Sequence, residues 1–355
     1  MKKMKLVLET GQEFSGAGYG AGTPAVGEIV FNTSMVGYQE ILSDPAYAGQ
    51  IVVMTYPLIG QYGIMDEDYE SKTVGLAGLV VRECCDTPSN FRYTKTLKET
   101  LEEHSIPCIA GLDTRMLPKL IRNKGQLRGA IVDEEMELDE ALKLIGSTKT
   151  GVDLVSEVSC KKRWFSRTPQ HSFDVVVIDC GIKHSVISAL NERGCNVTIV
   201  PFNSTMEDIL AFNPDGLLIS NGPGNPDGHP ELVDLIDAMK GRIPIFGICL
   251  GTEFIALSYG AKIGRIGCGH HGGHPVRNTK TGKIVTAEHN HCYSIIPESI
   301  EGTGLTVAYT DAGDGSIEGI ECREDKVFGV MFYPEGGPGP EETKFFDKFV
   351  KMMER

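Results

Sequence analysis

The best candidate nucleophile in this sequence is a cysteine held between two glycines. Residues 243–248 (IPIFGI) form an apolar run typical of a buried strand, and Gly247, Cys249 and Gly251 stand where this run gives way to a helical pattern. Flanking glycines permit the strained strand-to-helix turn that lifts a nucleophile out at a sheet edge. A thiol there would lie at a helix N-terminus, which lowers its pKa, and the backbone N–H of Leu250 could donate to a developing oxyanion. A buried structural cysteine explains the same pattern equally well.

A second candidate site is the glycine- and proline-rich loop at residues 221–226 (NGPGNP), which follows the apolar run 216–220 (GLLIS). Gly222 and Gly224 would let a substrate approach the backbone, although a plain connecting turn uses the same residue types. Both this loop and Cys249 follow predicted parallel strands. Ligands of open parallel sheets bind at the carboxyl ends of the strands, so we expect the site there.

Histidines gather in one part of the chain, which raises the question of a metal site. Five of the nine lie between residues 270 and 291, namely His270, His271, His274, His289 and His291. No H-E-x-x-H motif occurs, and HHGGH falls in a glycine-rich segment that we expect to be an extended loop and not a helix. We therefore expect no metal site in this chain.

Residues 15–22 (SGAGYGAG) form a loose version of the dinucleotide-binding fingerprint. The segment that follows them is a predicted strand, whereas the fingerprint requires a helix. We expect a flexible turn here and no nucleotide site, and the chain has no P-loop motif.

The elements that must position the candidate site alternate in the second half of the chain. Apolar runs at 173–179, 195–201, 216–220 and 243–248 predict buried strands, and residues 183–193 and 229–240 predict helices. This alternation predicts a doubly wound parallel sheet. Beyond residue 262 shorter β-like runs predict antiparallel strands, and an amphipathic helix over 342–353 ends the chain.

The first half, residues 1–150, alternates short β-like runs with turns and has helical periodicity over 94–104 and 113–125, so we expect a mixed α/β domain. A basic segment at 160–170 (CKKRWFSRTPQ) has the composition of a disordered bridge. We place a linker at residues 151–172 and a second domain at residues 173–355.

Length and composition exclude several classes of protein. A chain of 355 residues holds two or three domains at about 150 residues each. The formal net charge of −14 argues against a nucleic-acid or anionic membrane surface. The sequence has no signal-peptide pattern and no predicted membrane span. Its ten cysteines form no C-x-x-C pair, so we expect reduced thiols and a cytoplasmic location.

Longer motifs make the chain resemble a known family. The first half is similar to the N-terminal domain of the carbamoyl-phosphate synthase small chain at residues 27–63 (GEIVFNTSMVGYQEILSDPAYAGQIVVMTYPLIGQYG), 78–83 (GLVVRE), 88–90 (PSN) and 111–115 (GLDTR). The second half resembles its class I (triad) glutamine amidotransferase domain at DCGIKHSVI, ISNGPGNPDG, FGICLG, GHHGGHPV, HNHCYS and VMFYPEGGPGP. The first-half motifs distinguish this family from other triad amidotransferases, such as those of GMP or anthranilate synthesis.

The resemblance implies a reaction, a partner and a set of site residues. In the family, a Cys–His–Glu triad hydrolyses glutamine, and the ammonia passes through a tunnel to a large subunit that makes carbamoyl phosphate for the arginine and pyrimidine pathways. It therefore implies a cytoplasmic hetero-oligomer with no cofactor in this chain, since ATP and magnesium belong to the large subunit. Cys249 matches the nucleophile, Glu335 the triad carboxylate and Lys183 a lysine near the pocket. The glutamine-pocket positions match Ser34, Gly222, Gly224, Leu250, Glu253, Asn290, Cys292 and Tyr293.

This sequence departs from the family pattern at four positions around that pocket. The family motif F-H-P-E is F-Y-P-E here, so Tyr333 stands where the catalytic histidine belongs. Thr252 and Glu253 replace the histidine and glutamine of C-L-G-H-Q, and Cys292 replaces the glycine of N-H-G-[FY]. A phenol with a pKa of about 10 is a poor general base at neutral pH. Glu253 would bring a negative charge toward a carboxylate-bearing substrate, and Cys292 adds bulk.

Two functions are compatible with these departures. The chain could be a synthase small subunit whose glutaminase step is impaired, with His291 or one of the pair at 270–271 as a substitute base. Alternatively, it could be a catalytically inactive pseudo-glutaminase that docks to a synthetase and regulates it.

Overall fold

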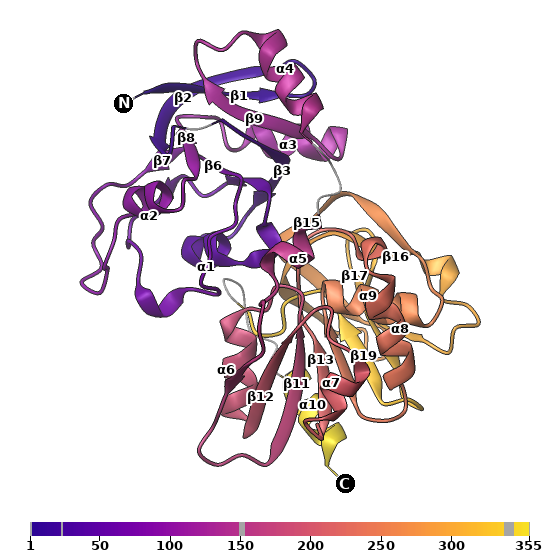
Figure 1. The fold of residues 1–355 in the computed structure, drawn as a ribbon. Helices are drawn as coiled ribbons and strands as arrows, with labels where there is room; N and C mark the ends of the chain where they lie inside the picture. Colours follow the sequence, from indigo (N-terminus) through magenta and orange to yellow (C-terminus); the bar gives the residue numbers. More distant parts are fainter. Residues whose placement is uncertain (1, 23, 149–152, 337–343, 355) are drawn as a thin grey trace. The chain divides into compact units, whose positions relative to one another are not determined.

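The computed structural model describes the whole chain except residues 1, 23, 149–152, 337–343 and 355. The described residues form two units, one built from residues 1–152 together with 267–271, the other from 153–266 and 272–355. The predicted boundary at residues 150–151 lies outside the described residues. The mixed α/β first half and the doubly wound second half are both confirmed (Figure 1).

The first unit is a closed β-barrel flanked by helices, and the closure is a feature that the sequence patterns do not predict. The strand order around the barrel is β1-β2-β8-β6-β4-β3-β9. The barrel strands are β1 (Lys3–Leu8), β2 (Glu13–Gly20), β3 (Ala25–Asn32), β4 (Gln50–Met54), β6 (Gly78–Val81), β8 (Pro107–Ala110) and β9 (Arg128–Asp133). The remaining elements are the small pair β5 (Leu58–Ile59) and β7 (Glu83–Cys84), with helices α1 (Tyr38–Ser43), α2 (Leu97–Glu103), α3 (Met116–Lys124) and α4 (Leu138–Ser147).

Alternation along the strands separates the interior of the barrel from its helix-covered side. Leu6 and Leu8 of β1 belong to the main hydrophobic cluster, together with alternate residues of β3, β4 and β9. Val7, between them, packs instead with Ala141 and Ile145 of α4. This is the period-two pattern of a strand buried on both faces.

The expectation of a flexible turn at residues 15–22 is wrong, because residues 13–20 form strand β2, which pairs with β1 and β8. The glycines there serve close packing. A Cβ at Gly16 would lie 2.4 Å from the carbonyl oxygen of Ala110, and one at Gly18 would lie 2.6 Å from Sδ of Met4. Glycine is therefore required by neighbouring strands and side chains, which a local reading of turn chemistry cannot detect.

The second unit contains a ten-stranded mixed sheet in the order β10-β12-β11-β13-β14-β19-β18-β17-β15-β16. Strands β12, β11, β13, β14 and β19 are parallel, and β17, β18 and β10 pair antiparallel to their neighbours. The strands are β10 (Trp164–Ser166), β11 (Phe173–Asp179), β12 (Cys195–Pro201), β13 (Gly216–Ile219), β14 (Ile245–Ile248), β15 (Ile263–Asn278), β16 (Ile284–Ile295), β17 (Thr306–Asp311), β18 (Ile317–Cys322) and β19 (Val327–Val330). The helices are α5 (Leu154–Val158), α6 (His184–Glu192), α7 (Met206–Leu210), α8 (Pro230–Met239), α9 (Leu250–Ser258) and α10 (Lys344–Met353).

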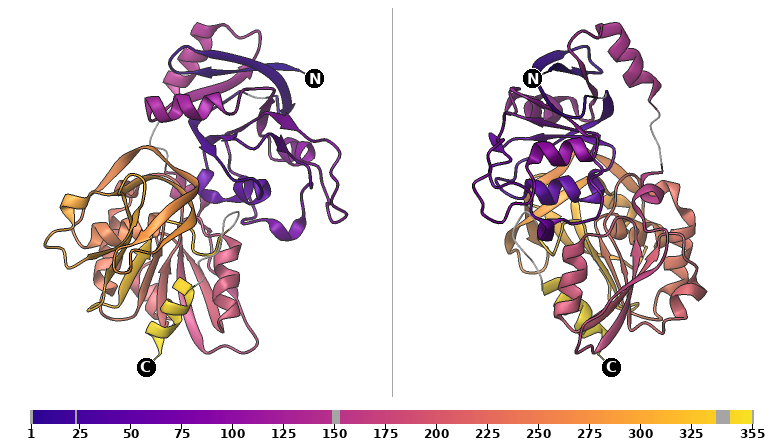
Figure 2. Two further views of the ribbon diagram at one scale, coloured as in Figure 1. Left: turned by 180° about the vertical axis from the view of Figure 1, so that it is seen from behind. Right: turned by 60° about the vertical axis from the view of Figure 1, so that its left-hand side comes forward.

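Helices cover both faces of the parallel part of this sheet. Val175 and Val177 of β11 pack in one cluster with residues of α6 and α10. Val176 and Ile178 pack in the opposite cluster with residues of α7, α8 and α9. Figures 1 and 2 show α6 and α8 on opposite sides of the strands. The continuous apolar run of β11 is thus explained by burial on both faces.

Two segments predicted to be irregular are strands. The basic segment at 160–170 contains β10, which adds antiparallel to β12 at the sheet edge, so the expectation of a disordered bridge is wrong there. The glycine-rich segment around HHGGH lies within β15, which contradicts the expected loop. Both strands are stabilised by pairing with distant segments, which overrides the local preference of the lysines that precede β10 and of the glycines within β15.

Among the described residues, no helix combines the length and the apolar character needed to cross a membrane. All ten cysteines lie in the described part of the chain, and none of them forms a disulfide.

Candidate functional site

Cys249 occupies a strained turn between β14 and α9. Its backbone has φ 52° and ψ −112°, a conformation that side-chain-bearing residues rarely adopt. Its N–H donates to the carbonyl of Val330 at 2.7 Å, which ties the turn to β19. A Cβ at Gly251 would lie 2.2 Å from the carbonyl oxygen of Ile219, so only glycine lets α9 pack this close to β13. The local geometry is the strand–turn–helix elbow that the G-x-C-x-G pattern predicts.

The Cys249 side chain faces β16. Its Sγ lies 3.6 Å from the carbonyl oxygen of Asn290, to which it donates, and the side chain is only 2% exposed. The hydroxyl of Thr252 lies 3.0 Å from the carbonyl of Gly247 and 2.7 Å from that of Val330. Thr252, at the position of a family histidine, therefore contributes hydrogen bonds that hold the elbow against β14 and β19.

The NGPGNP loop lies beside the elbow, as the strand order predicts. A Cβ at Gly222 would meet the carbonyl oxygen of Cys180 at 2.1 Å and Cδ2 of Leu250 at 3.0 Å. Gly224 has φ +89° and nothing within 4 Å of a Cβ position, so its need for glycine is conformational. Gly222 thus allows the loop to lie against the first residue of α9.

Behind these elements lies a buried charged pair at the position of the triad carboxylate. The Lys183 ammonium is 3.0 Å from Oε1 of Glu335 and 3.2 Å from the carbonyl oxygen of Gly336. The same ammonium lies 4.4 Å from the ring centroid of Tyr333, a cation–π contact. The side chains of Lys183 and Glu335 are 0% and 1% exposed. The N–H of Tyr333 also donates to the carbonyl of Glu288 at 2.8 Å.

Burial of Glu253 affects the charge of its carboxyl group, which the sequence analysis takes to be negative. Glu253 is 2% exposed on α9. Burial raises the pKa of its carboxyl well above the usual range, and the nearby Asp227 carboxylate adds to the shift. A neutral carboxylic acid has the shape of glutamine and offers one O–H donor and one carbonyl acceptor. The raised pKa favours this neutral form, which weakens the expected repulsion of substrate.

We expect Glu253→Gln to become more stable relative to the wild type as pH rises above about 4.3, the usual pKa of a glutamate. In the unfolded chain, the Glu253 carboxyl loses its proton at a pH of about 4.3, whereas in the folded protein it keeps the proton to higher pH. Over that range the free energy of unfolding of the wild type falls by up to about 1.4 kcal/mol per pH unit, because unfolding releases the proton. Urea unfolding at several pH values, followed by fluorescence of Trp164, measures this difference. Glu207→Gln, at an exposed glutamate, is the matched control and should show no such trend. A pH-independent difference for Glu253→Gln would contradict the prediction.

The remaining predicted pocket residues lie on two segments. Cys292 and Tyr293 follow Asn290 on β16, where the Tyr293 hydroxyl accepts from Nη1 of Arg265 at 3.2 Å. Ser34 belongs to the first unit, where its N–H donates to Oδ1 of Asn32 at 2.7 Å. Within the second unit the structure brings together Cys249 with Asn290, Gly222 with Leu250, and Lys183 with Glu335 and Tyr333.

His291, one of the residues considered as a substitute base, has partners away from the elbow. Its Nδ1 is 2.7 Å from the carbonyl oxygen of Tyr293, and its Nε2 is 3.4 Å from Oε2 of Glu318 on β18. His289 is 3.3 Å from the same Glu318 oxygen. The motifs did not identify Glu318 at all. The one available signal was the spacing of His289 and His291, because residues two apart on a strand share a face.

Comparison with known families gives matches over both halves of the chain. Residues 6–131 match the family described as "Carbamoyl-phosphate synthase small chain, CPSase domain". Residues 176–353 match "Glutamine amidotransferase class-I".

Several curated proteins are similar over the full length. A "Carbamoyl phosphate synthase small chain" of Staphylococcus epidermidis is 44% identical to this chain, and the alignment covers 99% of this chain and 96% of the length of that relative. A "Carbamoyl phosphate synthase pyrimidine-specific small chain" of Halalkalibacterium halodurans is 43% identical over 99% of this chain and 97% of its own. Among solved structures, a putative GMP synthase component from Thermoplasma acidophilum has a TM-score of 0.45 and 24% identity over 52% of this chain and 94% of its own.

Proposed function

Because this chain belongs to the carbamoyl-phosphate synthase small-chain family, a family of glutamine amidotransferases, we propose that it is a synthase small subunit whose glutaminase step is impaired. In this role it binds a large synthetase subunit in the cytoplasm. It would hydrolyse glutamine slowly at Cys249 and pass ammonia to the partner for carbamoyl phosphate synthesis in the arginine or pyrimidine pathway. ATP and magnesium would be used by the large subunit.

The observation that supports impairment is Tyr333 at the triad histidine position. Its ring is 2% exposed and is stacked against the Lys183 ammonium at 4.4 Å. A phenol next to a buried cation has no basic lone pair comparable to that of a neutral imidazole. It cannot accept the Cys249 proton and return it to the leaving ammonia within a catalytic cycle at neutral pH.

Other features support retention of substrate binding. The elbow keeps a strained cysteine at the start of α9, and burial favours the protonated form of Glu253, which can replace the glutamine of the family motif. A thiol at a helix N-terminus is also less dependent on a base than a serine hydroxyl is. The proposal is therefore slow hydrolysis, with the pocket itself maintained.

The alternative is a catalytically inactive pseudo-glutaminase that serves as a docking or regulatory subunit. Cys292 supports this alternative, since it adds a side chain where the family has glycine, and it is 9% exposed on β16 next to Asn290. A blocked pocket would remove glutamine hydrolysis entirely. The complex would then depend on free ammonia.

One experiment separates the two functions. The full-length chain is mixed with the large synthetase chain of the same genome, and carbamoyl phosphate formation is measured with glutamine and with ammonium chloride. Slow glutamine-dependent formation that Cys249→Ala abolishes supports the impaired enzyme. Formation with ammonium alone supports the docking subunit, and no effect of the small chain with either nitrogen source refutes both.

We expect the chain to form a stable complex with that large synthetase chain, because the first unit is the part of the molecule that is specific to this family. Size-exclusion chromatography of the two chains mixed at micromolar concentration should show co-elution. Tyr333→Phe should co-elute equally well, since Tyr333 is buried in the second unit. Separate elution of the wild-type chains would count against both functions.

We expect Tyr333→His to accelerate ammonia release from glutamine by about 10²-fold, the lower end of what general acid–base catalysis contributes. Restoration should be incomplete, because Cys292 remains in the pocket, and Cys292→Gly should add to the gain. Tyr333→Phe is the matched control: it removes the phenol without supplying a base and should give no gain. Complete rescue by Tyr333→His alone would show that the pocket is otherwise competent.

A further inference from the structure

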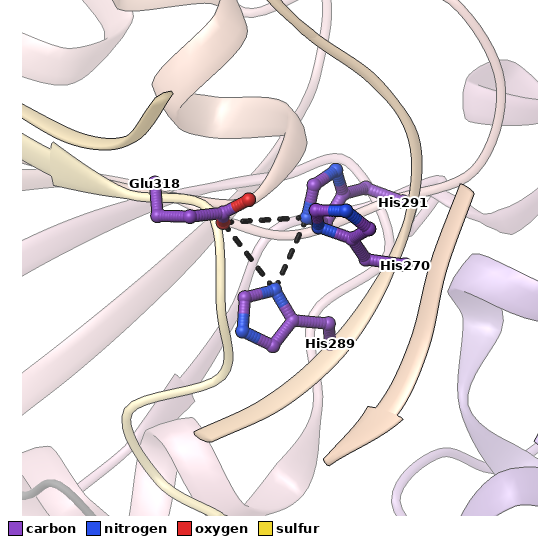
Figure 3. Close-up of side chains that lie close together, drawn as sticks. All are labelled: His270, His289, His291 and Glu318. Carbon is purple, nitrogen blue, oxygen red and sulfur yellow. Dashed lines mark hydrogen bonds and ion pairs between the residues drawn. The ribbon is translucent and has the colours of Figure 1, made fainter. Parts of the chain in front are cut away.

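A buried cluster of potential metal ligands lies in the second unit, formed by residues that the proposed function does not use. His289 and His291 stand on β16 and Glu318 on β18, and their exposed fractions are 0%, 6% and 0%. Figure 3 shows the imidazole rings directed toward the Glu318 carboxylate. His270, also drawn there, belongs to the segment 267–271 that groups with the first unit, and only the three residues of the second unit enter the site. We propose that His289, His291 and Glu318 bind a divalent transition-metal ion such as Zn²⁺.

The fold directs these side chains to one point. Residues 289 and 291 are two apart on a strand, so both imidazoles leave the same face of β16. The hydroxyl of Ser294 donates to the carbonyl of Ile317 at 2.9 Å, which holds β16 next to the start of β18. Glu318 follows Ile317 directly.

The distances fit ligands that share one ion. Nδ1 of His289 and Nε2 of His291 are 3.2 Å apart. Oε2 of Glu318 is 3.3 Å from the former atom and 3.4 Å from the latter. Four-coordinate zinc with bonds of about 2.0–2.1 Å to nitrogen and oxygen places adjacent ligand atoms about 3.3–3.4 Å apart. The three atoms therefore form one face of a tetrahedron of the right size.

The hydrogen bond of His291 fixes which ring nitrogen faces this point. Nδ1 lies 2.7 Å from the Tyr293 carbonyl oxygen, which can only accept, so Nδ1 carries the proton. In the neutral ring Nε2 then presents a lone pair toward the Glu318 carboxylate, itself an acceptor. A cation placed between these two acceptors would interact favourably with both. Metal-binding histidines are commonly oriented by such a bond from the other ring nitrogen to a carbonyl.

The donor set selects the class of metal. Two imidazoles and one carboxylate form the protein part of zinc sites that keep a fourth position open, and imidazole also suits copper, iron and nickel. Calcium and magnesium take oxygen ligands almost exclusively. An ion here would anchor the strand on which Asn290, between the two histidines, accepts a hydrogen bond from the Cys249 thiol.

The test is zinc binding by the full-length chain and matched variants. After treatment with a chelator and dialysis, zinc affinity is measured by competition with a chromogenic zinc chelator. We expect about one zinc per wild-type chain and an affinity loss of more than about tenfold in His289→Gln and Glu318→Gln, since even outer partners of zinc ligands change affinity by about 10–100-fold. His229→Gln is the control. His229 is also buried between two carboxylates, but Asp153 and Glu231 contact opposite ring nitrogens, so they cannot share an ion with it.

Two further measurements do not depend on the folding of the variants. Zinc should raise the wild-type unfolding temperature reversibly, because ligands that bind the folded state stabilise it. Cobalt(II) in place of zinc should give the visible absorption of a four-coordinate site without a thiolate charge-transfer band. Equal zinc affinity in wild type, His289→Gln and Glu318→Gln would overturn the proposal. So would the absence of zinc binding to the wild type, or a thiolate band that assigns the metal to a cysteine.

Discussion

Purified full-length chain should release ammonia from glutamine about 10⁴-fold or more slowly than a small-chain relative with histidine at the position of Tyr333. Loss of the base from a catalytic triad costs about 10⁴–10⁶ in rate. The structure offers no compensation from Tyr333 itself, whose buried ring is packed against the Lys183 ammonium. Under the proposed function, the thiol remains in the elbow and Tyr333 does not move its proton.

The measurement is single-turnover and steady-state ammonia release, with and without the large chain. Cys249→Ala provides the background rate for both proteins. Turnover similar to that of the relative, abolished by Cys249→Ala, would mean that another group serves as base. His291 would then be tested first with His291→Asn, although its ring nitrogens face Glu318 and the Tyr293 carbonyl.

The sequence was most informative where the structure depends on residues that are close together in the chain. The apolar runs of β11, β13 and β14 predicted buried parallel strands because burial on both faces leaves a continuous signal. The elbow at Cys249 was predictable because its strand, glycines and helix are contiguous. By contrast, β2, β10 and β15 were missed because partners distant in sequence, β8, β12 and β17, help to stabilise them against their local composition.

Contacts between distant residues in the site could not be predicted in the same way. Lys183 and Glu335 are 152 positions apart, and no local pattern connects them. The raised pKa of Glu253 could not be predicted either, because it depends on burial, which requires the packed α9. Glu318 was missed for the same reason that the contact between Lys183 and Glu335 could not be predicted: it meets His289 and His291 only through the arrangement of the strands.

Lys183→Met should destabilise the second unit by about 3–5 kcal/mol, the cost of removing one partner from a buried ion pair. The mutation takes away the cation that lies 3.0 Å from Glu335 and leaves that carboxylate in a site that is 1% exposed. It also removes the cation–π contact with Tyr333, worth about 2 kcal/mol when desolvated. Trp164 is the only tryptophan and belongs to the second unit, so its fluorescence during urea unfolding reports on the affected unit.

Two comparisons show whether this loss arises from the buried charge. Lys262→Met removes an exposed lysine of the same unit, so it should cost no more than about 0.5 kcal/mol. The double variant Lys183→Met/Glu335→Leu should recover most of the lost stability, because replacing both charges by apolar groups removes the desolvation cost. A loss below about 1 kcal/mol for Lys183→Met would mean that other groups neutralise Glu335. If the double variant does not recover stability, the loss arises from the packing of the Lys183 side chain and not from the buried charge of Glu335. Both variants would then be destabilised by the methionine at position 183.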